Sequence, residues 1–129
     1  MLENATINGK PSSSGGVVRI LIVDDNPATR RTTEIGLKVA GFQVEVAGGV
    51  GEALSMLRDS SYDYVISDIR MPLKTGLDLM EEGQRLSPDT KWILMSEFEF
   101  PADEVRDRNL KPHGFLRKPF KIIELIKLW

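Results

Sequence analysis

Five short apolar runs alternate with five segments of helical character along residues 17–129, and this order limits the fold more than any other feature. The predicted strands cover residues 17–23, 42–47, 62–67, 91–96 and 114–117. The predicted helices cover residues 27–40, 52–59, 77–86, 101–110 and 120–129. Strands that alternate with helices form a parallel sheet through right-handed crossovers. We therefore expect an α/β fold, a doubly wound five-stranded parallel sheet with helices on both faces.

The composition excludes several classes of protein. A chain of 129 residues, 41% of them apolar, can bury one core without disulfides. With 17 basic and 19 acidic residues, its net charge of -2 provides no polybasic surface for nucleic acid or an anionic membrane. The absence of cysteine excludes disulfides and thiolate metal sites. No apolar run reaches the length of a membrane span, about 18 residues, and no signal peptide is visible. We therefore expect a cytoplasmic protein.

The first 16 residues differ from the rest of the chain. They are small and polar, end in Pro-Ser-Ser-Ser-Gly-Gly, and show no helical or strand periodicity. We interpret residues 1–16 as a disordered tail or linker and residues 17–129 as the folded domain.

Polar side chains follow four of the five predicted strands. Asp24 and Asp25 follow the first strand, Asp68 the third, Ser96 ends the fourth, and Lys118 follows the fifth. The carboxyl ends of parallel strands share one edge of the sheet, which is where open α/β proteins hold their ligands. We therefore expect these five side chains to converge.

Three converging carboxylates require a compensating cation. At about 4 Å and an effective dielectric near 20, each like-charged pair costs roughly 4 kcal/mol. Mg²⁺ binds carboxylates, carbonyl oxygens and water. The simpler alternative is that Asp24 and Asp25 only help Asn26 to cap the first helix. A nucleophilic carboxylate with a cation, an ammonium group and a hydroxyl donor is the set needed to place a phosphoryl group on Asp68.

With these residues in this order, the chain resembles a known family, the receiver (phosphoacceptor) domains of two-component response regulators. The resemblance covers residues 19–129. Its motifs are Val-Asp-Asp-Asn at 23–26, Ser-Asp-Ile-Arg-Met-Pro at 67–72, the serine at 96 and Arg-Lys-Pro-Phe at 117–120. It implies the (βα)5 flavodoxin-like receiver fold. It also implies a phosphoacceptor signalling domain rather than an enzyme, with self-phosphorylation from small donors and autodephosphorylation as its only reactions.

The resemblance implies roles for the acidic residues. Asp68 would accept the phosphoryl group from the phosphohistidine of a sensor histidine kinase or phosphotransfer protein. Asp25 would bind Mg²⁺ (or Mn²⁺) directly, together with Asp68, and Asp24 would help largely through water. The backbone carbonyl of Arg70 would complete the metal site.

The resemblance also implies how the signal leaves the site. Lys118 would pair with the phosphoryl group and Ser96 would turn inward to hydrogen-bond it. Phe115 matches the aromatic residue whose rotamer follows that serine, and the bond between Lys118 and Pro119 is often cis in the family. The face formed by the fourth helix, fifth strand and fifth helix would then change. An output domain or partner protein would read that face, and it could form a homodimer.

The chain departs from the family pattern beside the expected opening to Asp68. Glu97 stands where the family usually has alanine or glycine, and Arg70 faces the same opening. We expect both residues to control access to Asp68 and the lifetime of its phosphorylated state, through an ion pair across the opening. Phe98 and Phe100 form an aromatic pair in the same loop, which suggests a partner surface.

Three other functions use related features. A haloacid-dehalogenase hydrolase needs a second aspartate at the place of Arg70. A flavodoxin-like FMN binder needs a phosphate loop after the first strand, where Asp24 and Asp25 would repel phosphate. A degenerate receiver that binds partners without phosphorylation stays open as the alternative.

Overall fold

The computed structural model describes residues 6–7, 10–11 and 16–129. Most of the tail that we expect to be disordered, residues 1–5, 8–9 and 12–15, therefore lies outside the described residues. Within the tail, β1 (Thr6–Ile7) and β2 (Lys10–Pro11) pair as two short antiparallel strands.

The predicted parallel sheet is confirmed. Its strands are β3 (Arg19–Val23), β4 (Gln43–Ala47), β5 (Tyr64–Asp68), β6 (Lys91–Ser96) and β7 (Gly114–Arg117). They lie in the order β4-β3-β5-β6-β7, and every neighbouring pair is parallel. The central strand β5 is buried along its whole length, as expected for a strand that is covered on both faces.

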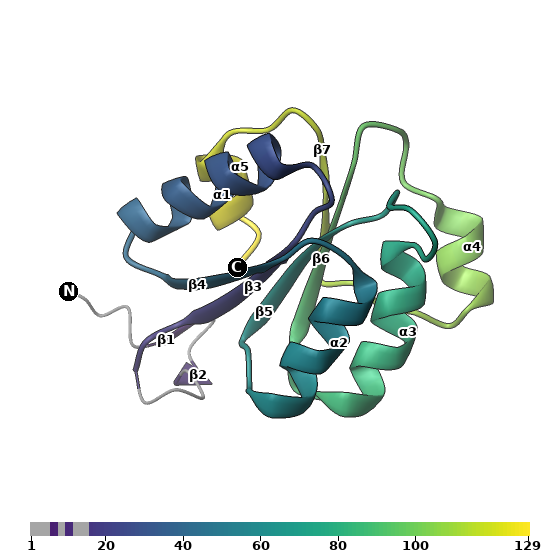
Figure 1. The fold of residues 1–129 in the computed structure, drawn as a ribbon, viewed down its shortest axis with the longest axis horizontal. Helices are drawn as coiled ribbons and strands as arrows, with labels where there is room; N and C mark the ends of the chain where they lie inside the picture. The colour runs from purple at the N-terminus through teal and green to yellow at the C-terminus, as the bar shows by residue number, and fades with distance from the viewer. Residues whose placement is uncertain (1–5, 8–9, 12–15) are drawn as a thin grey trace.

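Helices cover both faces of the sheet (Figure 1). They are α1 (Pro27–Val39), α2 (Val50–Asp59), α3 (Gly76–Leu86), α4 (Ala102–Asp107) and α5 (Ile122–Ile126). α1 and α5 lie together on one face, and α2, α3 and α4 lie on the other. Within the described part of the chain, none of these helices is long and apolar enough to cross a membrane.

The last two helices are shorter than the sequence predicts. α4 ends at Asp107 because Asn109 adopts a left-handed conformation with φ 58°, which stops a helix. α5 begins only at Ile122, because Lys121 has extended backbone angles and acts as the N-cap.

Alternate residues of the strands point to opposite faces of the sheet and pack in two separate cores. Leu21, Val23 and Val65 pack with α2 and α3, whereas Ile20 and Ile22 pack with α1 and α5. This two-sided burial fixes the register of each strand, because a shift by one residue would exchange the two faces. It thereby fixes which polar residues emerge at the carboxyl edge.

Gly76 allows α3 to begin directly against the end of β5. Its amide donates a hydrogen bond to the carbonyl of Ile69 at 2.7 Å. A Cβ atom at this position would lie 2.2 Å from the carbonyl oxygen of Asp68, so no larger residue fits without a backbone shift. Thr75 and Asp78 cap the same helix reciprocally. The backbone around Asp68 is therefore held on both sides.

Candidate functional site

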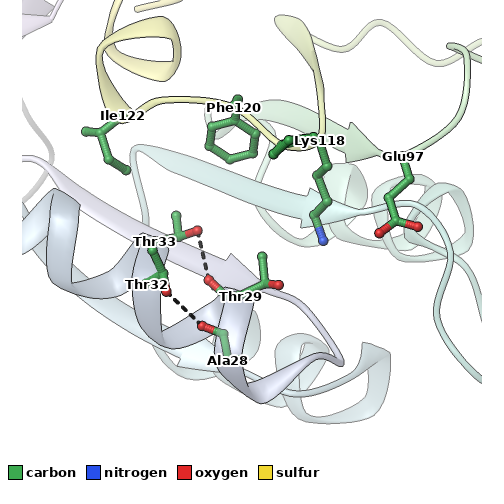
Figure 2. A pocket seen from close by; sticks show the side chains of 9 residues that line it. Ala28, Thr29, Thr32, Thr33, Glu97, Lys118, Phe120 and Ile122 are labelled. Atoms are coloured by element: carbon green, nitrogen blue, oxygen red, sulfur yellow. Dashed lines mark hydrogen bonds between the residues drawn. The ribbon is translucent and has the colours of Figure 1, made fainter.

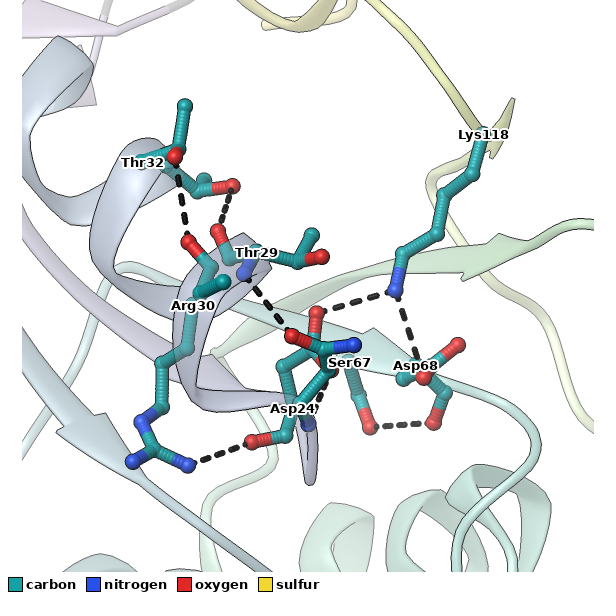
Figure 3. Close-up of polar contacts among 10 residues, drawn as sticks. Asp24, Thr29, Arg30, Thr32, Ser67, Asp68 and Lys118 are labelled. Atoms are coloured by element: carbon teal, nitrogen blue, oxygen red, sulfur yellow. Dashed lines mark hydrogen bonds and ion pairs between the residues drawn. The ribbon is translucent and has the colours of Figure 1, made fainter.

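The polar residues that follow the strands meet at one edge of the sheet, as the topology predicts. Figure 3 shows Asp24, Asp68 and Lys118 around a common centre, with Lys118 reaching both carboxylates. Asp24 is 0% exposed and Asp68 is 7% exposed, whereas Asp25 is open to solvent. Two carboxylates are thus buried beside each other, which requires a positive charge between them.

The three aspartates form a set of hard oxygen donors. One carboxylate oxygen each from Asp24, Asp25 and Asp68 lies within 4.8 Å of the other two. Oxygen donors at this separation suit Mg²⁺, which takes few protein carboxylates and keeps several water molecules. The exposed position of Asp25 leaves room for that water, so these residues fit the expected metal.

Lys118 is shared between two aspartates. Its Nζ lies 2.9 Å from Asp24 Oδ2 and 3.3 Å from Asp68 Oδ2, and its side chain is 11% exposed. Burial works against the ammonium charge, but the hydrogen bond to Asp24 and the charge of Asp68 outweigh it, so the pKa of Lys118 is raised. Its shorter contact is with Asp24, a pairing that sequence reasoning did not assign.

The protonation of Asp68 responds to the same surroundings. Burial raises the pKa of Asp68 to about 6; Lys118 opposes this shift, and the charges of Asp24 and Asp25 add to it. A cation beside Asp68 would favour its charged, nucleophilic form.

Both carboxylate oxygens of Asp24 already have partners. Oδ1 accepts from the amide of Asn26 at 2.9 Å, and Oδ2 binds Lys118. The Asp24 carbonyl also accepts from Arg30 Nη1 at 2.9 Å, a contact absent from the sequence prediction. The Asn26 side chain separately caps α1 by accepting from Thr29. The capping alternative is therefore right for Asn26. Asp24 instead binds the backbone of its own loop and Lys118, and the Asp25 carboxylate is exposed to solvent.

Ser96 ends β6, and Phe115 lies in the neighbouring strand β7. Ser96 is 3% exposed, and its Oγ accepts a hydrogen bond from the Phe98 amide at 3.0 Å. Phe115 is half-buried, with its ring centroid 5.1 Å from that of Phe100. Phe100 therefore packs towards the core, and only Phe98 of the predicted aromatic pair is exposed, at 51%. The Lys118–Pro119 peptide bond is cis.

The expected ion pair between Arg70 and Glu97 is wrong for this structure. The Arg70 guanidinium carbon lies 4.2 Å from the centroid of the Phe98 ring instead. Among the described residues, Glu97 makes no ion pair; its backbone carbonyl accepts from Arg117 Nε at 2.9 Å. An exposed ion pair contributes little over its entropy cost, whereas an aromatic face also offers flat contact area to the guanidinium group.

A cavity of about 210 Å³ opens over Asp68. It is lined by Asp25, Asn26, Thr29, Asp68, Arg70, Ser96, Glu97, Phe98 and Lys118. Every predicted site residue therefore lines the same space, except Asp24, which is buried, and Phe115, which is half-buried in β7. Asn26, Thr29 and Phe98 are additional members of the lining. Asn26 and Phe98 already stood out in the sequence, as part of the Val-Asp-Asp-Asn motif and of the aromatic pair, whereas Thr29 is one helical turn after Asp25 and carried no signal of its own.

A second cavity of about 360 Å³ adjoins the first between α1 and the segment that leads into α5 (Figure 2). Thr29, Glu97 and Lys118 line both cavities. The hydroxyl groups of Thr32 and Thr33 donate to carbonyls of the preceding helical turn, so this wall is largely apolar. Sequence reasoning missed this cavity, although threonines at 29, 32 and 33 share one face of the first helix.

Comparison with known proteins gives one consistent result. A family model described as the response regulator receiver domain matches residues 20–129. Response regulator MprA of Mycobacterium sp. (strain KMS) is 29% identical over 109 residues, which are 84% of this chain and 47% of that protein. The chain thus spans about half the length of the curated relatives it matches, among them MprA of Mycobacterium tuberculosis (strain ATCC 25177 / H37Ra), also at 29% identity and 47% coverage.

Solved structures agree with this result. A CheY-like receiver domain protein from Methanospirillum hungatei JF-1 aligns with a TM-score of 0.80 and 29% identity, covering 86% of this chain and 89% of that one. TrrA from Thermotoga maritima, solved in complex with Mg(2+)-BeF, aligns with a TM-score of 0.77 and 30% identity, covering 88% and 100%. The fold and the acidic edge define the class of CheY-like, flavodoxin-like receivers. The chain belongs to the response regulator receiver domain family.

Proposed function

We propose that this chain is a phosphorylation-dependent switch of a two-component system, and that Asp68 is its phosphoacceptor. The observation that carries the proposal is the placement of the Asp68 carboxylate: 7% exposed, 3.3 Å from the Lys118 ammonium, and within 4.8 Å of two further carboxylates. No other carboxylate among the described residues combines burial, a lysine and an acidic cluster at the base of an open cavity.

In the proposed reaction, an oxygen of Asp68 attacks the phosphorus atom of a phosphohistidine. The P–N bond breaks, its electron pair stays on the imidazole, and an aspartyl phosphate forms. Lys118 neutralises developing charge, and the Ser96 hydroxyl, which accepts from Phe98, keeps its own proton to donate to a phosphoryl oxygen. Mg²⁺ (or Mn²⁺), held by Asp25, Asp68 and the Arg70 carbonyl with Asp24 acting through water, would supply further charge neutralisation.

The signal would leave through the face formed by α4, β7 and α5. Phosphorylation adds roughly two negative charges, and Ser96 and Phe115 respond to them. The phosphoryl group shifts the population of that face only as far as it binds one arrangement better. We propose an output domain or a separate partner as its reader, a sensor histidine kinase or phosphotransfer protein as the donor, and the cytoplasm as the location. Homodimers through this face, and the lack of direct nucleic-acid binding by this chain, are part of the same proposal.

The proposal is tested with the wild-type chain, Mg²⁺, and either acetyl phosphate or beryllofluoride. We expect a Mg²⁺-dependent adduct in the intact mass with acetyl phosphate, which peptide mapping assigns to Asp68, and none in EDTA. The complex of TrrA with Mg(2+)-BeF supports the choice of beryllofluoride as the second probe. An absent adduct, or one on another residue, would contradict the proposal and favour a phosphorylation-independent interaction module.

Arg70 controls the lifetime of the phosphorylated state in this proposal, through its contact with Phe98. Arg70→Ala should shorten the half-life of phosphorylated Asp68 by about two- to fivefold, since an exposed cation–π contact is worth roughly 0.5–1 kcal/mol. The reason is that the two side chains line the mouth of the Asp68 cavity, which opens to water when they separate. The decay is followed by intact mass after the donor is removed.

The matched control for this prediction is Arg106→Ala, because Arg106 is an exposed arginine whose ion pairs, among the described residues, are with Asp103 and Asp107 of the same helix α4. Phe98→Ala should shorten the lifetime as much as Arg70→Ala, and the double variant should decay no faster than either single variant. Additive effects of the two substitutions would show that the residues act separately.

A further inference from the structure

Glu97 lines the mouth of the Asp68 cavity, and no cation of the described residues forms an ion pair with it; Asp25, the other exposed carboxylate of the lining, belongs to the acidic cluster that the proposed metal would neutralise. It lines both cavities together with Thr29 and Lys118. Figure 2 shows the side chains of Glu97 and Lys118 both pointing towards the first turns of α1. Glu97 is exposed, and its carboxylate makes no ion pair in the described part of the chain. Its charge therefore faces whatever approaches Asp68 from solvent.

The neighbouring cations are engaged elsewhere. The Lys118 ammonium lies between Asp24 and Asp68. The Arg70 guanidinium lies over the Phe98 ring, and Arg117 donates to the backbone carbonyl of Glu97 rather than to its carboxylate. The contact with Arg117 also holds the Glu97 backbone in place. The Glu97 carboxylate at the mouth of the cavity thus has no ion-pair partner among the described residues.

We infer that Glu97 is a specificity-determining residue that disfavours small dianionic phosphodonors. The inference rests on the proposed function of Asp68 and extends it to the class of donor. With acetyl phosphate, the Asp68 oxygen forms a bond to phosphorus, the P–O bond to the acetyl group breaks, and acetate leaves with the electron pair. The whole dianion must pass Glu97 before this step. A phosphohistidine on a donor protein is not disfavoured in this way when positive charges around that histidine compensate the charge of Glu97.

The size of the effect follows from Coulomb's law. For a unit charge about 6 Å from a dianion in a water-like dielectric, removal of the charge speeds approach about five- to tenfold at low ionic strength. For a monoanion the same removal gives only about two- to threefold. Near 1 M salt the Debye length falls to about 3 Å, and both effects should nearly vanish. Steric hindrance would show neither the dependence on donor charge nor the dependence on salt.

The experiment compares wild type with Glu97→Gln at saturating Mg²⁺. Glutamine keeps the size of the side chain and removes its charge. Acetyl phosphate serves as the dianionic donor and phosphoramidate, largely a monoanion near neutral pH, as the singly charged one. The second-order rate constant of adduct formation on Asp68 is measured by intact mass at low and at high salt. Glu99→Gln is the matched control, because Glu99 is exposed in the same loop and lines neither cavity.

We expect Glu97→Gln to react about five- to tenfold faster than wild type with acetyl phosphate at low salt. The gain should be smaller with phosphoramidate and lost at high salt, and Glu99→Gln should match wild type. Equal gains with both donors, a gain that persists at high salt, or no gain would overturn the inference and leave the proposed function standing. An adduct on neither wild type nor Glu97→Gln would overturn the proposed function itself, and this inference with it.

Discussion

Asp68→Asn should abolish the Mg²⁺-dependent adduct and at the same time stabilise the metal-free fold by about 1–3 kcal/mol near pH 7.5. The loss of the adduct follows because an amide is no nucleophile for phosphorus. The gain in stability follows because the pKa of Asp68 is raised to about 6 by burial, with Asp24 and Asp25 adding to the effect and Lys118 opposing it. Near neutral pH Asp68 is therefore largely charged in the folded chain, although burial makes this charged form less favourable there than in the unfolded chain. Urea unfolding in EDTA measures the difference.

The pH dependence of this gain has a definite sign. A carboxyl whose pKa is higher in the fold contributes stability fully below its unfolded pKa of 3.8, and loses it as the pH rises through about 6. Protonated Asp68 resembles asparagine, so the advantage of Asp68→Asn should shrink steadily from about pH 7.5 to about pH 4. Added Mg²⁺ should stabilise wild type more than the variant. An advantage that does not change with pH would contradict this account, and Asp103→Asn, exposed on α4, provides the control.

The sequence predicts the sheet and the membership of the site for a topological reason. Strands that alternate with helices must run parallel, and parallel strands deliver the residues after them to the same edge. Asp68 and Lys118 lie far apart in the sequence, yet the topology of the sheet places both at its carboxyl edge, where they form an ion pair. Helix ends were harder to predict, because the left-handed Asn109 and the extended Lys121 decide where α4 and α5 stop and start.

Contacts between loop side chains could not be predicted in the same way. Arg70 had two partners within reach of its loop, and the preference for Phe98 over Glu97 depends on less than about 1 kcal/mol. Periodicity carries no information about side chains outside strands and helices. The second cavity was also missed, because it depends on how the segment after β7 passes over the threonines of α1.

Lys118→Met should destabilise the metal-free chain by about 3–5 kcal/mol, the usual effect of removing one partner from a buried ion pair. Asp24 is 0% exposed, and among the described residues Lys118 is the only cation that binds its carboxylate, since Arg30 contacts the Asp24 backbone carbonyl. Methionine keeps most of the volume of the side chain, so the loss comes from the missing charge rather than from a cavity. Urea unfolding of both chains in EDTA measures the difference in free energy.

The stability that Mg²⁺ restores to Lys118→Met shows whether the variant is destabilised by the missing charge or by altered packing. A divalent ion among the three carboxylates would replace much of the missing positive charge, so saturating Mg²⁺ should restore a larger share of stability to the variant than it adds to wild type. Lys111→Met, at an exposed lysine outside the site, should lose little in either buffer. If Lys118→Met lost no more than Lys111→Met, the buried carboxylates would not depend on Lys118. Phosphorylation should still weaken in Lys118→Met when Mg²⁺ restores the fold, because the ion cannot also take the place of the ammonium beside the incoming phosphoryl group.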